Sequence, residues 1–382
     1  MKKNIFISLG LMSGTSMDGV DLSIIKSDGI NKVEQLYDKY IEFDNNLHDE
    51  LFDLREHLNK SDDLVRYSKK IRDIEKKFTL FNVEIVKEVL NETGLEIDLI
   101  GFHGQTILHQ PEKKISEQLG DGNLLSQLTK CLVVNKFRQN DLDNSGQGAP
   151  LTPIFHSLVS KKLNEGFNLN YPIDIINIGG ITNVSQIIND GDVEKNIFAY
   201  DVSPGNCLID QWLRKNSNKR YDANGEIANS GRVDELIFNQ AIENFEITSI
   251  KESLDIKDFD LTFVKGLTLE DGCATLTKFT AHLIYEGLKK IDQLNNLQTN
   301  NYIVCGGGRK NKTLIKYINQ FMNKKKSSLK NIDQYKINGD FVESQAFAYL
   351  AIRSFLNLPI SFPNTTRCKK SISGGIIVKN FN

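Results

Sequence analysis

Hydrophobic and polar positions alternate along the chain in two patterns, one typical of strands and one typical of helices. Residues 4–11 and 20–26 alternate apolar with small or polar side chains, which predicts two strands joined by the turn-rich segment SGTSMDG. From about His48 to Thr93, apolar residues recur every three or four positions between lysines and glutamates, as on an amphipathic helix. Strands and helices then alternate toward the end of the chain. This alternation indicates an α/β fold with largely parallel central sheets.

The second half of the sequence repeats the organisation of the first. The segment IDIINIGGITNVSQII again predicts a strand, a turn rich in Gly and Thr, and a second strand, as NIFISLGLMSGTSMDGVDLSII does near the start. Between the halves lies NDLDNSGQGAPLTP, a loop rich in small and polar residues. We therefore expect one domain over residues 1–145 and a second over 146–382, with the late helix free to pack back onto the first.

Composition and charge exclude several classes of protein. The 382 residues include 47 Lys and Arg against 49 Asp and Glu, a net charge of −2, whereas proteins that grip nucleic acid or an anionic membrane favour a basic surplus. No stretch has the roughly 18 consecutive apolar residues that a membrane helix needs. The five cysteines are scattered and never form C-x-x-C, so neither a disulfide framework nor a structural zinc site is expected. These features favour a cytoplasmic protein.

Three glycine-rich turns follow predicted strands: Gly14 to Gly19, Gly179 to Asn183, and Gly306 to Gly308. Each alone is more often a tight turn than a ligand site, and none matches a Walker A loop or G-x-G-x-x-G. Together they favour a nucleotide site, in which two strand–loop–strand clamps hold a phosphate chain and the third loop lies under the nucleoside.

The first of these turns also carries side chains suited to a phosphate and its metal. Thr15 and Ser16 offer hydroxyls toward a terminal phosphate, and Asp18 and Asp21 could hold Mg²⁺ through water. The plainer interpretation is that Asp18-Gly19 forms only a hairpin turn. The two interpretations are compatible.

Seven segments, in order along the chain, resemble one known family. They are GLMSGTSMDGVD, GFHGQTILHQP, LGDGNLL, FRQNDLDNSGQGAPLTPIFH, NIGGITN, SPGNCLIDQW and CGGGRKN. The family is anhydro-N-acetylmuramic acid kinase, and the resemblance runs from about residue 8 to residue 356. It implies the two-lobed fold of the sugar kinase, Hsp70 and actin superfamily, with a central sheet and a phosphate-binding hairpin in each lobe and a cleft between the lobes.

The resemblance also implies an activity. Members of the family use ATP, Mg²⁺ and water to open the internal 1,6-anhydro bond of anhydro-N-acetylmuramic acid and to phosphorylate O6, in bacterial peptidoglycan recycling. The base that deprotonates the water falls on Asp141 of FRQND, and the acidic residue that helps to hold the water falls on Glu343. In isolation, Asp141 would be interpreted as a turn or capping carboxylate, given Asn140 and Asp143 beside it. A homodimer is implied as well, with no nucleic-acid or membrane partner.

The binding residues follow from the same matched segments. The sugar is expected to meet His103, Gln105, Arg138, Gln147, Asp201 and Asn206, with Arg138 paired to the lactyl carboxylate. For His103, a buried structural histidine is an equally good interpretation. ATP is expected at Gly14, Thr15, Ser16, Met17, Asp18, Gly19, Val20, Asp21, Gly179, Gly180, Thr182, Asn183, Gly306, Gly307 and Gly308, with Mg²⁺ near Asp18 through water.

Three segments depart from the family pattern. Val202 and Ser203 stand in DVSPGN where Thr and Gly are usual. Arg367 and Cys368 stand in TTRCKK where small residues are expected, and Lys136 stands where an acid is common. These changes bear on sugar specificity. Two alternatives to the family's reaction stay open: a kinase of another sugar without ring opening, and a non-catalytic, nucleotide-dependent sugar sensor or actin-like assembly protein.

Overall fold

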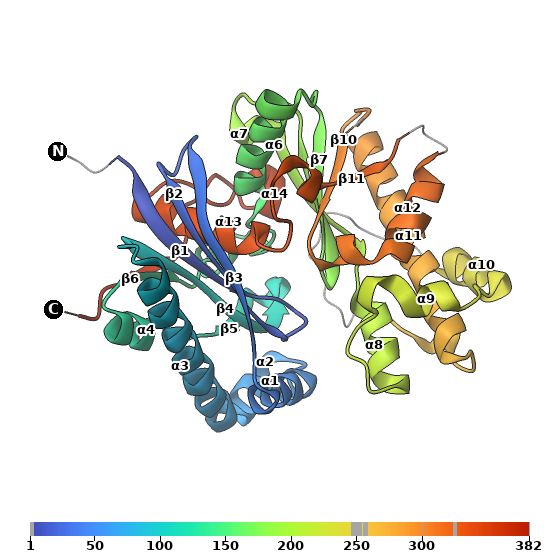
Figure 1. Ribbon diagram of the computed structural model, residues 1–382, viewed down its shortest axis with the longest axis horizontal. Coiled ribbons are helices and arrows are strands. Elements are labelled where there is room, and N and C mark those ends of the chain that lie inside the picture. Colours follow the sequence, from blue (N-terminus) through green and yellow to red (C-terminus); the bar gives the residue numbers. More distant parts are fainter. Residues whose placement is uncertain (1–3, 246–253, 255–258, 300, 324–326, 382) are drawn as a thin grey trace. The chain divides into compact units, whose positions relative to one another are not determined.

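The computed structural model describes residues 4–245, 254, 259–299, 301–323 and 327–381 (Figure 1). The chain divides into two compact units: unit 1 comprises Met1–Leu158 and Phe341–Asn382, and unit 2 comprises Val159–Asp340. Within the described ranges, no helix is both long enough and apolar enough to cross a membrane. Each unit has its own β-sheet with helices packed on it.

Unit 1 is built on a seven-stranded mixed sheet. Its strands are β1 (Phe6–Ser13), β2 (Gly19–Ser27), β3 (Val33–Glu42), β4 (Leu99–Gln110), β5 (Ile115–Leu119), β6 (Leu132–Asn135) and β12 (Ile376–Val378). The strand order is β12-β6-β4-β1-β2-β3, and β5 pairs with β4 beside this path. Strands β1, β2 and β3 form antiparallel hairpins, whereas β1, β4 and β6 run parallel. The carboxyl ends of β1, β4 and β6 therefore meet at one edge of the sheet.

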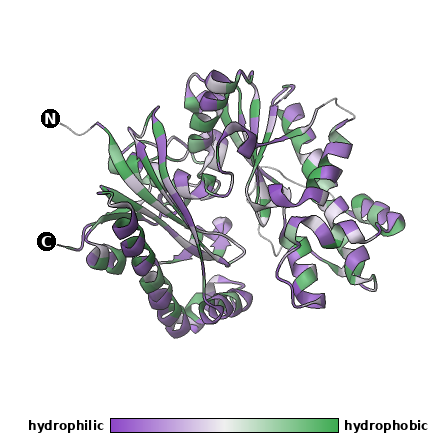
Figure 2. Cartoon of the chain, viewed as in Figure 1, coloured by the Kyte–Doolittle hydropathy of each residue, from purple (hydrophilic) through white to green (hydrophobic). Residues whose placement is uncertain are grey.

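Helices cover both faces of this sheet. The helices of unit 1 are α1 (Asn45–His57), α2 (Ser61–Arg66), α3 (Ser68–Thr93), α4 (Gly122–Thr129), α5 (Gln139–Asp143), α13 (Val342–Phe355) and α14 (Pro363–Thr366), and α6 (Pro153–Phe167) begins in this unit. Gly10 of β1 lets α13 approach closely, because a β-carbon there would lie 2.0 Å from the Ser344 carbonyl oxygen. On the other face, Leu9 and Leu11 pack in one core with residues of α1 and α3. Hydrophobic and hydrophilic bands alternate along α3, as expected of an amphipathic helix (Figure 2).

Unit 2 is built on a five-stranded sheet with the order β11-β10-β7-β8-β9. Its strands are β7 (Ile173–Ile178), β8 (Ile181–Ile187), β9 (Ile197–Pro204), β10 (Asn301–Cys305) and β11 (Leu329–Asn331). The helices are α7 (Val193–Asn196), α8 (Cys207–Asn216), α9 (Glu226–Ser230), α10 (Glu235–Asn244), α11 (Leu269–Leu294) and α12 (Lys312–Met322). Apolar side chains of α11 and α12 form a core with β7, β9 and β10.

The two sheets share one plan. In each, the first strand is followed on one side by the next two strands of the sequence, each antiparallel to its neighbour. On its other side lie two later strands, each parallel to its neighbour. The order β6-β4-β1-β2-β3 of unit 1 thus corresponds to β11-β10-β7-β8-β9 of unit 2. The expected α/β class, with a central sheet in each of two lobes, is confirmed. The expectation that these sheets are largely parallel is wrong: both are mixed, because each begins with antiparallel hairpins.

The division of the chain differs from the one expected from the sequence. The first boundary falls between Leu158 and Val159, inside α6, rather than after residue 145. Residues 341–382 belong to unit 1, where they supply α13 against the sheet and the edge strand β12.

Local hydrogen bonds explain the shifted boundary. The loop with the composition of a linker is folded into unit 1, because the backbone N–H groups of Gly146 and Gln147 donate to the carbonyl oxygens of Asp141 and Thr366. The small and polar residues of this loop form a tight turn around Asp141. Amino-acid composition alone does not distinguish such a turn from a linker between domains.

Candidate active site

The carboxyl edge of the unit 1 sheet gathers three of the predicted segments. The first glycine turn follows β1, His103 and Gln105 lie in β4, and Arg138 and Asp141 follow β6. Ser13, the last residue of β1, pairs in register with Gln105 of β4. Parallel pairing of strands therefore brings together residues that are far apart in the sequence.

The turn after β1 is held from within the unit and leaves its hydroxyls exposed. The Ser13 hydroxyl donates to Gln105 Oε1 (2.6 Å), and Gln105 Nε2 donates to the Gly14 carbonyl oxygen (3.1 Å). Thr15 and Ser16, by contrast, are exposed. Gln105 is 0% exposed, so the structure engages it in positioning the turn, while Thr15 and Ser16 are accessible to a ligand.

Other residues of this turn can offer a ligand only their backbone. The side chains of Met17 and Val20 are buried in the core of unit 1. Gly19 begins β2 and lies against β3, where a β-carbon would come within 2.3 Å of the Ile41 carbonyl oxygen. The turn is thus a true hairpin connection as well as a candidate phosphate loop.

His103, which is buried, and Arg138, which is partly exposed, form a hydrogen-bonded pair. Arg138 Nη2 lies 2.8 Å from His103 Nε2, and His103 Nδ1 lies 2.8 Å from the Gly104 carbonyl oxygen. Burial, and secondly the Arg138 charge, hold the pKa of His103 well below its usual value. The imidazole is therefore neutral, with Nδ1–H donating to Gly104 and Nε2 accepting from Arg138. The contacts of His103 in this structure are thus those expected of a buried structural histidine.

Asp141 is the centre of the next set of contacts. It lies in α5 and is 1% exposed. Its Oδ1 accepts the Thr366 hydroxyl (2.6 Å), and its Oδ2 accepts the Gly148 N–H (2.7 Å). Burial raises the pKa of Asp141, and the hydrogen bonds from Thr366 and Gly148 partly offset that rise. Arg138 Nη1 donates to the Gly148 carbonyl oxygen (2.8 Å), so Gly148 links the Arg138–His103 pair to Asp141.

Glu343 lies in the first turn of α13 and is partly exposed. The two residues that follow it face strands β2 and β3. The Ser344 hydroxyl lies 2.7 Å from that of Ser23, and Gln345 Nε2 donates to both carboxylate oxygens of Asp38 (3.2 Å each). These contacts fix the start of the helix that carries Glu343.

In unit 2, the second and third glycine turns leave the same edge of the sheet. Strands β7 and β10 run parallel, with Asn177 opposite Cys305. Gly306 has a φ of +77°, and a β-carbon there would lie 2.3 Å from Asn177 Oδ1. A β-carbon at Gly308 would lie 2.2 Å from Ile178 Cγ2. The turn over Gly306–Gly308 therefore packs directly on the end of β7, beside Gly179.

The β7–β8 turn is fixed by the residues after β9. The carbonyl oxygens of Gly179 and Gly180 accept the N–H groups of Asn206 (2.8 Å) and Gly205 (2.8 Å). The Thr182 hydroxyl donates to the Pro204 carbonyl oxygen (3.2 Å) and is buried. The segment that contains Asn206 is thus built into the second candidate phosphate loop.

Comparison with known proteins decides the family. The family model described as anhydro-N-acetylmuramic acid kinase matches residues 6–380. The chain belongs to the anhydro-N-acetylmuramic acid kinase family. The expected family and the expectation of an enzyme, a kinase, are confirmed.

Individual relatives of the anhydro-N-acetylmuramic acid kinase family cover nearly the whole chain. The curated kinase of Pelagibacter ubique (strain HTCC1062) is 51% identical over 379 residues, which are 98% of this chain and 99% of the relative. That of Brucella canis (strain ATCC 23365 / NCTC 10854 / RM-666) is 36% identical over 376 residues, 97% of this chain and 98% of the relative. Among solved structures, the activator of the 2-hydroxyisocaproyl-CoA dehydratase from Clostridium difficile with bound ADPNP matches 91% of this chain and 94% of its own at 12% identity and a TM-score of 0.41.

The departure from the anhydro-N-acetylmuramic acid kinase pattern at DVSPGN lies inside strand β9. Val202 is 1% exposed and belongs to the core of unit 2, where it packs on Gly287 of α11. The Ser203 hydroxyl is buried and donates to the Pro204 carbonyl oxygen (2.9 Å). Asp201, just before them, accepts the N–H of Leu254 on Oδ2 (3.0 Å). Neither altered side chain is exposed to a ligand in this structure.

The departure at TTRCKK lies beside Asp141 and includes a residue that the sequence reasoning missed. Thr366, which donates to Asp141, stands in a segment that the sequence marks only as divergent from the family pattern. Arg367, where a small residue is expected, adopts a left-handed φ of +67°, a conformation that favours glycine. Cys368 is buried, and burial raises the pKa of its thiol to about 11. Spatial proximity of residue 366 to residue 141 has no sequence signal, because 225 positions separate them.

Lys136, the third departure, is exposed and has a φ of +51°. It lies just after β6 and before Arg138. Its charge favours the ionised form of Glu117 in β5, because Lys136 lowers the pKa of that carboxyl against the rise caused by burial.

Arg309 ties the third glycine turn to the end of unit 2. Its side chain is 2% exposed. Nη1 donates to the Gly306 carbonyl oxygen (3.0 Å) and to Asp340 Oδ1 (2.6 Å), and Nε donates to Asp333 Oδ2 (3.0 Å). The Gly306 N–H also donates to the Gly339 carbonyl oxygen (3.1 Å). The candidate adenosine loop is therefore rigidly attached to the last residues of this unit.

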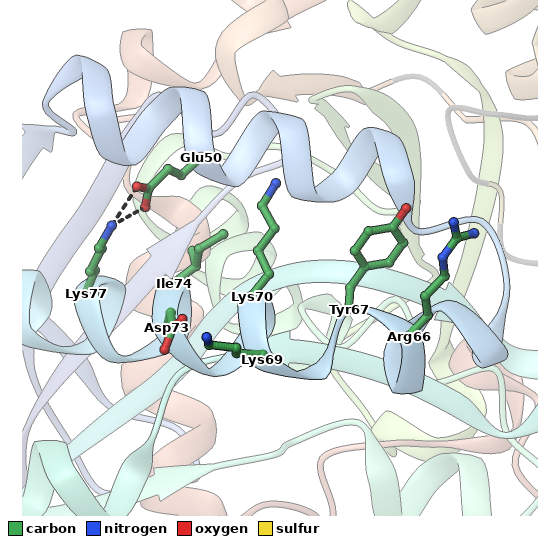
Figure 3. A pocket seen from close by; sticks show the side chains of 8 residues that line it. All are labelled: Glu50, Arg66, Tyr67, Lys69, Lys70, Asp73, Ile74 and Lys77. Atoms are coloured by element: carbon green, nitrogen blue, oxygen red, sulfur yellow. Dashed lines mark hydrogen bonds and ion pairs between the residues drawn. The ribbon is translucent and has the colours of Figure 1, made fainter.

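A surface cavity of about 420 Å³ lies elsewhere in unit 1, beside α1, α2 and α3 (Figure 3). Two of its three lysines pair with acids: Lys77 with Glu50 (2.6 Å) and Lys70 with Asp53. The residues that line it are Glu50, Arg66, Tyr67, Lys69, Lys70, Asp73, Ile74 and Lys77, none of which is among the predicted site residues. The cavity is a hollow between helices whose lining has more basic than acidic side chains.

Proposed function

We propose that the protein opens the 1,6-anhydro ring of 1,6-anhydro-N-acetylmuramic acid with water and transfers the γ-phosphoryl group of ATP to O6. The products are N-acetylmuramic acid 6-phosphate and ADP, and the reaction is a cytoplasmic step of peptidoglycan recycling. The observation that carries this proposal is the Asp141 carboxylate, which is hydrogen-bonded on both oxygens and linked through Gly148 to the Arg138–His103 pair.

Asp141 is the proposed base. Water attacks C1 and gives its proton to the Asp141 carboxylate, while the C1–O6 bond breaks and O6 keeps the electron pair. O6 then attacks the γ-phosphorus, and the bond from that phosphorus to the leaving oxygen of ADP breaks. Because burial raises the pKa of Asp141, this carboxylate is a stronger base than an exposed aspartate. Glu343, at the start of α13, is proposed to help orient the water.

The glycine turns are the proposed nucleotide contacts. Phosphoryl transfer depends mainly on positioning and on stabilisation of charge, which backbone N–H groups and hydroxyls provide. Thr15 and Ser16 in unit 1 are exposed hydroxyls suited to phosphate oxygens. In unit 2, the turns at Gly179–Asn183 and Gly306–Gly308 are assigned to phosphate and adenosine, since both leave the carboxyl edge of the sheet.

Mg²⁺ fits the first turn as an ion shared with water and phosphate. Within the described ranges, no three His, Cys, Asp or Glu side chains are grouped so as to hold a metal ion. The Asp18 side chain is 28% exposed, and its Oδ1 lies 3.9 Å from His48 Nε2. Such an accessible carboxylate, with Asp21 near it in β2, suits an ion that keeps several waters. When bound, Mg²⁺ would neutralise charge on the transferred group.

The proposed sugar contacts are taken from the segments that resemble the family. Arg138 is proposed to bind the lactyl carboxylate, because His103 and Gly148 fix the plane of its guanidinium. Gln147, Asp201 and Asn206 are proposed to meet hydroxyl or N-acetyl groups. His103 and Gln105 are proposed to act by holding Arg138 and the first turn, respectively.

One experiment tests the reaction. The protein is incubated with ATP, Mg²⁺ and 1,6-anhydro-N-acetylmuramic acid in ¹⁸O-labelled water, and the product is analysed by mass spectrometry. We expect a gain of water plus phosphate, with the label at C1. A gain of phosphate alone would instead indicate a kinase that leaves the ring closed, and nucleotide binding without any product would indicate a sensor.

We further infer that the protein forms a homodimer, as the family resemblance implies. Light scattering coupled to size-exclusion chromatography tests this directly. A mass of one chain at micromolar concentration would contradict it.

A further inference from the structure

We propose that Thr366 is a positioning residue for Asp141, which holds the carboxylate in the orientation required for proton abstraction. This inference rests on the proposed function of Asp141 as the base. Thr366 lies at the end of α14 and is 0% exposed, and Asp141 is 1% exposed. The contact between them is therefore shielded from solvent on both sides.

The hydrogen bond has a defined direction and a short length. An ionised carboxylate can only accept, so the Thr366 hydroxyl is the donor. The distance from Thr366 Oγ1 to Asp141 Oδ1 is 2.6 Å, within the range of a charge-assisted bond between a hydroxyl and a carboxylate. Such a bond is about twice as strong as one between neutral groups. It fixes the rotation of the carboxylate.

Thr366 also holds the loop that supplies the second donor. Its carbonyl oxygen accepts the N–H of Gln147 (2.7 Å), and the next residue, Gly148, donates its own N–H to Asp141 Oδ2 (2.7 Å). Both oxygens of the carboxylate thus depend on Thr366, one directly and one through the loop.

The neighbouring threonine has a different task and provides a control. The Thr365 hydroxyl accepts the N–H of Phe362 (3.2 Å) and donates to the Phe362 carbonyl oxygen (3.1 Å), so it closes the turn of α14. Both threonines are buried, but only Thr366 contacts Asp141. Variants at the two positions therefore distinguish an effect on the stability of α14 from an effect on the orientation of Asp141.

Removal of the Thr366 hydroxyl has a predictable effect on the pH profile. The bond from Thr366 lowers the pKa of Asp141 against the rise caused by burial. Without it, the pKa of Asp141 rises further, and a higher pH is needed to ionise the base. The acidic limb of the kcat profile therefore moves to higher pH in Thr366→Val.

The kinetic test compares three variants with the wild type: Thr366→Val, Thr366→Ser and Thr365→Val. For Thr366→Val we expect kcat to fall about 10- to 100-fold, part of the roughly 10²–10⁴-fold that one general base contributes. The KM for ATP should remain unchanged, and Thr366→Ser should recover most of the activity and the wild-type limb. Wild-type kcat and an unshifted limb in Thr366→Val, or an equal loss in Thr365→Val, would overturn the proposal.

A second measurement does not depend on turnover. The urea midpoint of unfolding is determined for Thr366→Val in the wild-type background and in Asp141→Ala. We expect Thr366→Val to lower the midpoint clearly in the first background and little in the second. Equal shifts would overturn the positioning contact, even if the enzyme is active. Unequal shifts in a protein that fails to form the ring-opened product would overturn the proposed reaction and leave the contact standing. If Thr366→Val does not fold, Thr366→Ala replaces it in both tests.

Discussion

Gly146 confines the carboxylate of Asp141: a β-carbon at residue 146 would come within 2.1 Å of Oδ2 and 2.5 Å of Oδ1. The φ of Gly146 lies outside the left-handed region, so alanine can adopt its backbone conformation. In Gly146→Ala we therefore expect a folded protein whose kcat is lower by about 100-fold, the usual effect of displacing a reacting group by about 1 Å.

Steady-state kinetics and circular dichroism check this prediction. Gly166→Ala, in α6 with no atom within 4 Å of its added β-carbon, is the matched control and should behave as the wild type. A kcat within twofold of the wild type in Gly146→Ala would show that the carboxylate need not lie where the structure has it.

Asp141→Asn preserves the shape of the side chain and removes the base. We expect ATP binding to persist and turnover to fall by more than the roughly 10²–10⁴-fold typical of one general base. The reason is that no O6 alkoxide forms without attack by water. Calorimetric titration with ATP and product assay measure the two effects separately. Near-normal turnover would refute the assignment of Asp141.

Arg309→Met should weaken the third glycine turn. The change removes the donors to the Gly306 carbonyl oxygen, Asp333 and Asp340. It leaves the partly exposed Asp333 without its cationic partner, whereas Asp340 keeps its ion pair with Lys310 (2.6 Å). We expect a loss of stability of about 2–3 kcal/mol, below the usual range for a fully buried pair because the acids reach solvent. The KM for ATP should rise. Properties of unit 1 that do not involve ATP should stay as in the wild type.

Urea unfolding and ATP kinetics test this prediction, with Arg309→Lys as an intermediate variant that keeps the charge but loses the forked geometry. An unchanged KM for ATP in a folded Arg309→Met protein would argue against a nucleotide role for Gly306–Gly308.

Stability should fall on the acid side of neutrality because of His156. Burial lowers the pKa of His156 from 6.5 to about 3, so the folded protein cannot take up the proton that the unfolded chain binds. The contribution of this residue to the free energy of unfolding is complete above a pH of about 6.5. It is lost as the pH falls toward 3, and the free energy of unfolding then changes by about 1.4 kcal/mol per pH unit. His103 acts in the same direction.

The measurement is urea unfolding between pH 5 and pH 7.5 for the wild type and His156→Gln. The free energy of unfolding should depend less on pH in the variant than in the wild type, by a difference in slope that corresponds to about one proton taken up on unfolding. Parallel curves for the two proteins would mean that His156 is protonated in the folded state.

Val202→Thr, which restores the residue usual in the family, should reduce stability and leave sugar specificity unchanged. Val202 is buried against Gly287 in the core of unit 2, and a hydroxyl there costs about 1–3 kcal/mol unless it finds a partner. Thermal unfolding and the KM for the sugar provide the two readouts. A changed KM with unchanged stability would place residue 202 at the substrate after all.

Much of the fold follows from sequence patterns that reflect local physics. Alternating and three-to-four-residue periodicities predicted the strands and helices of both units, because burial of one face governs each element. The boundary near residue 145 was displaced for an equally physical reason. The glycines and prolines after Asp141 resemble a linker by composition, but Gly146 and Gly148 are there to pass close to a carboxylate.

Part of the candidate site lies in one segment of the sequence. Arg138 and Asp141, both named from the sequence, share that segment, and Gly148, which the sequence did not single out as a site residue, joins them by hydrogen bonds. Thr366 could not be predicted, since only tertiary folding brings it to Asp141. Likewise, the sequence suggested a ligand role for Gln105, whereas its burial under Gly14 makes it a support for the turn.

The distribution of unit 1 over both ends of the chain has a consequence for synthesis on the ribosome. Unit 2 is continuous from Val159 to Asp340, so its segment emerges whole and can fold while translation continues. Unit 1 begins first but lacks α13 and β12 until residues 342–378 are made. The nascent amino-terminal part therefore lacks the helix that covers one face of its sheet until late in translation. A chain that ends after Asp340 contains all of unit 2 but only part of unit 1.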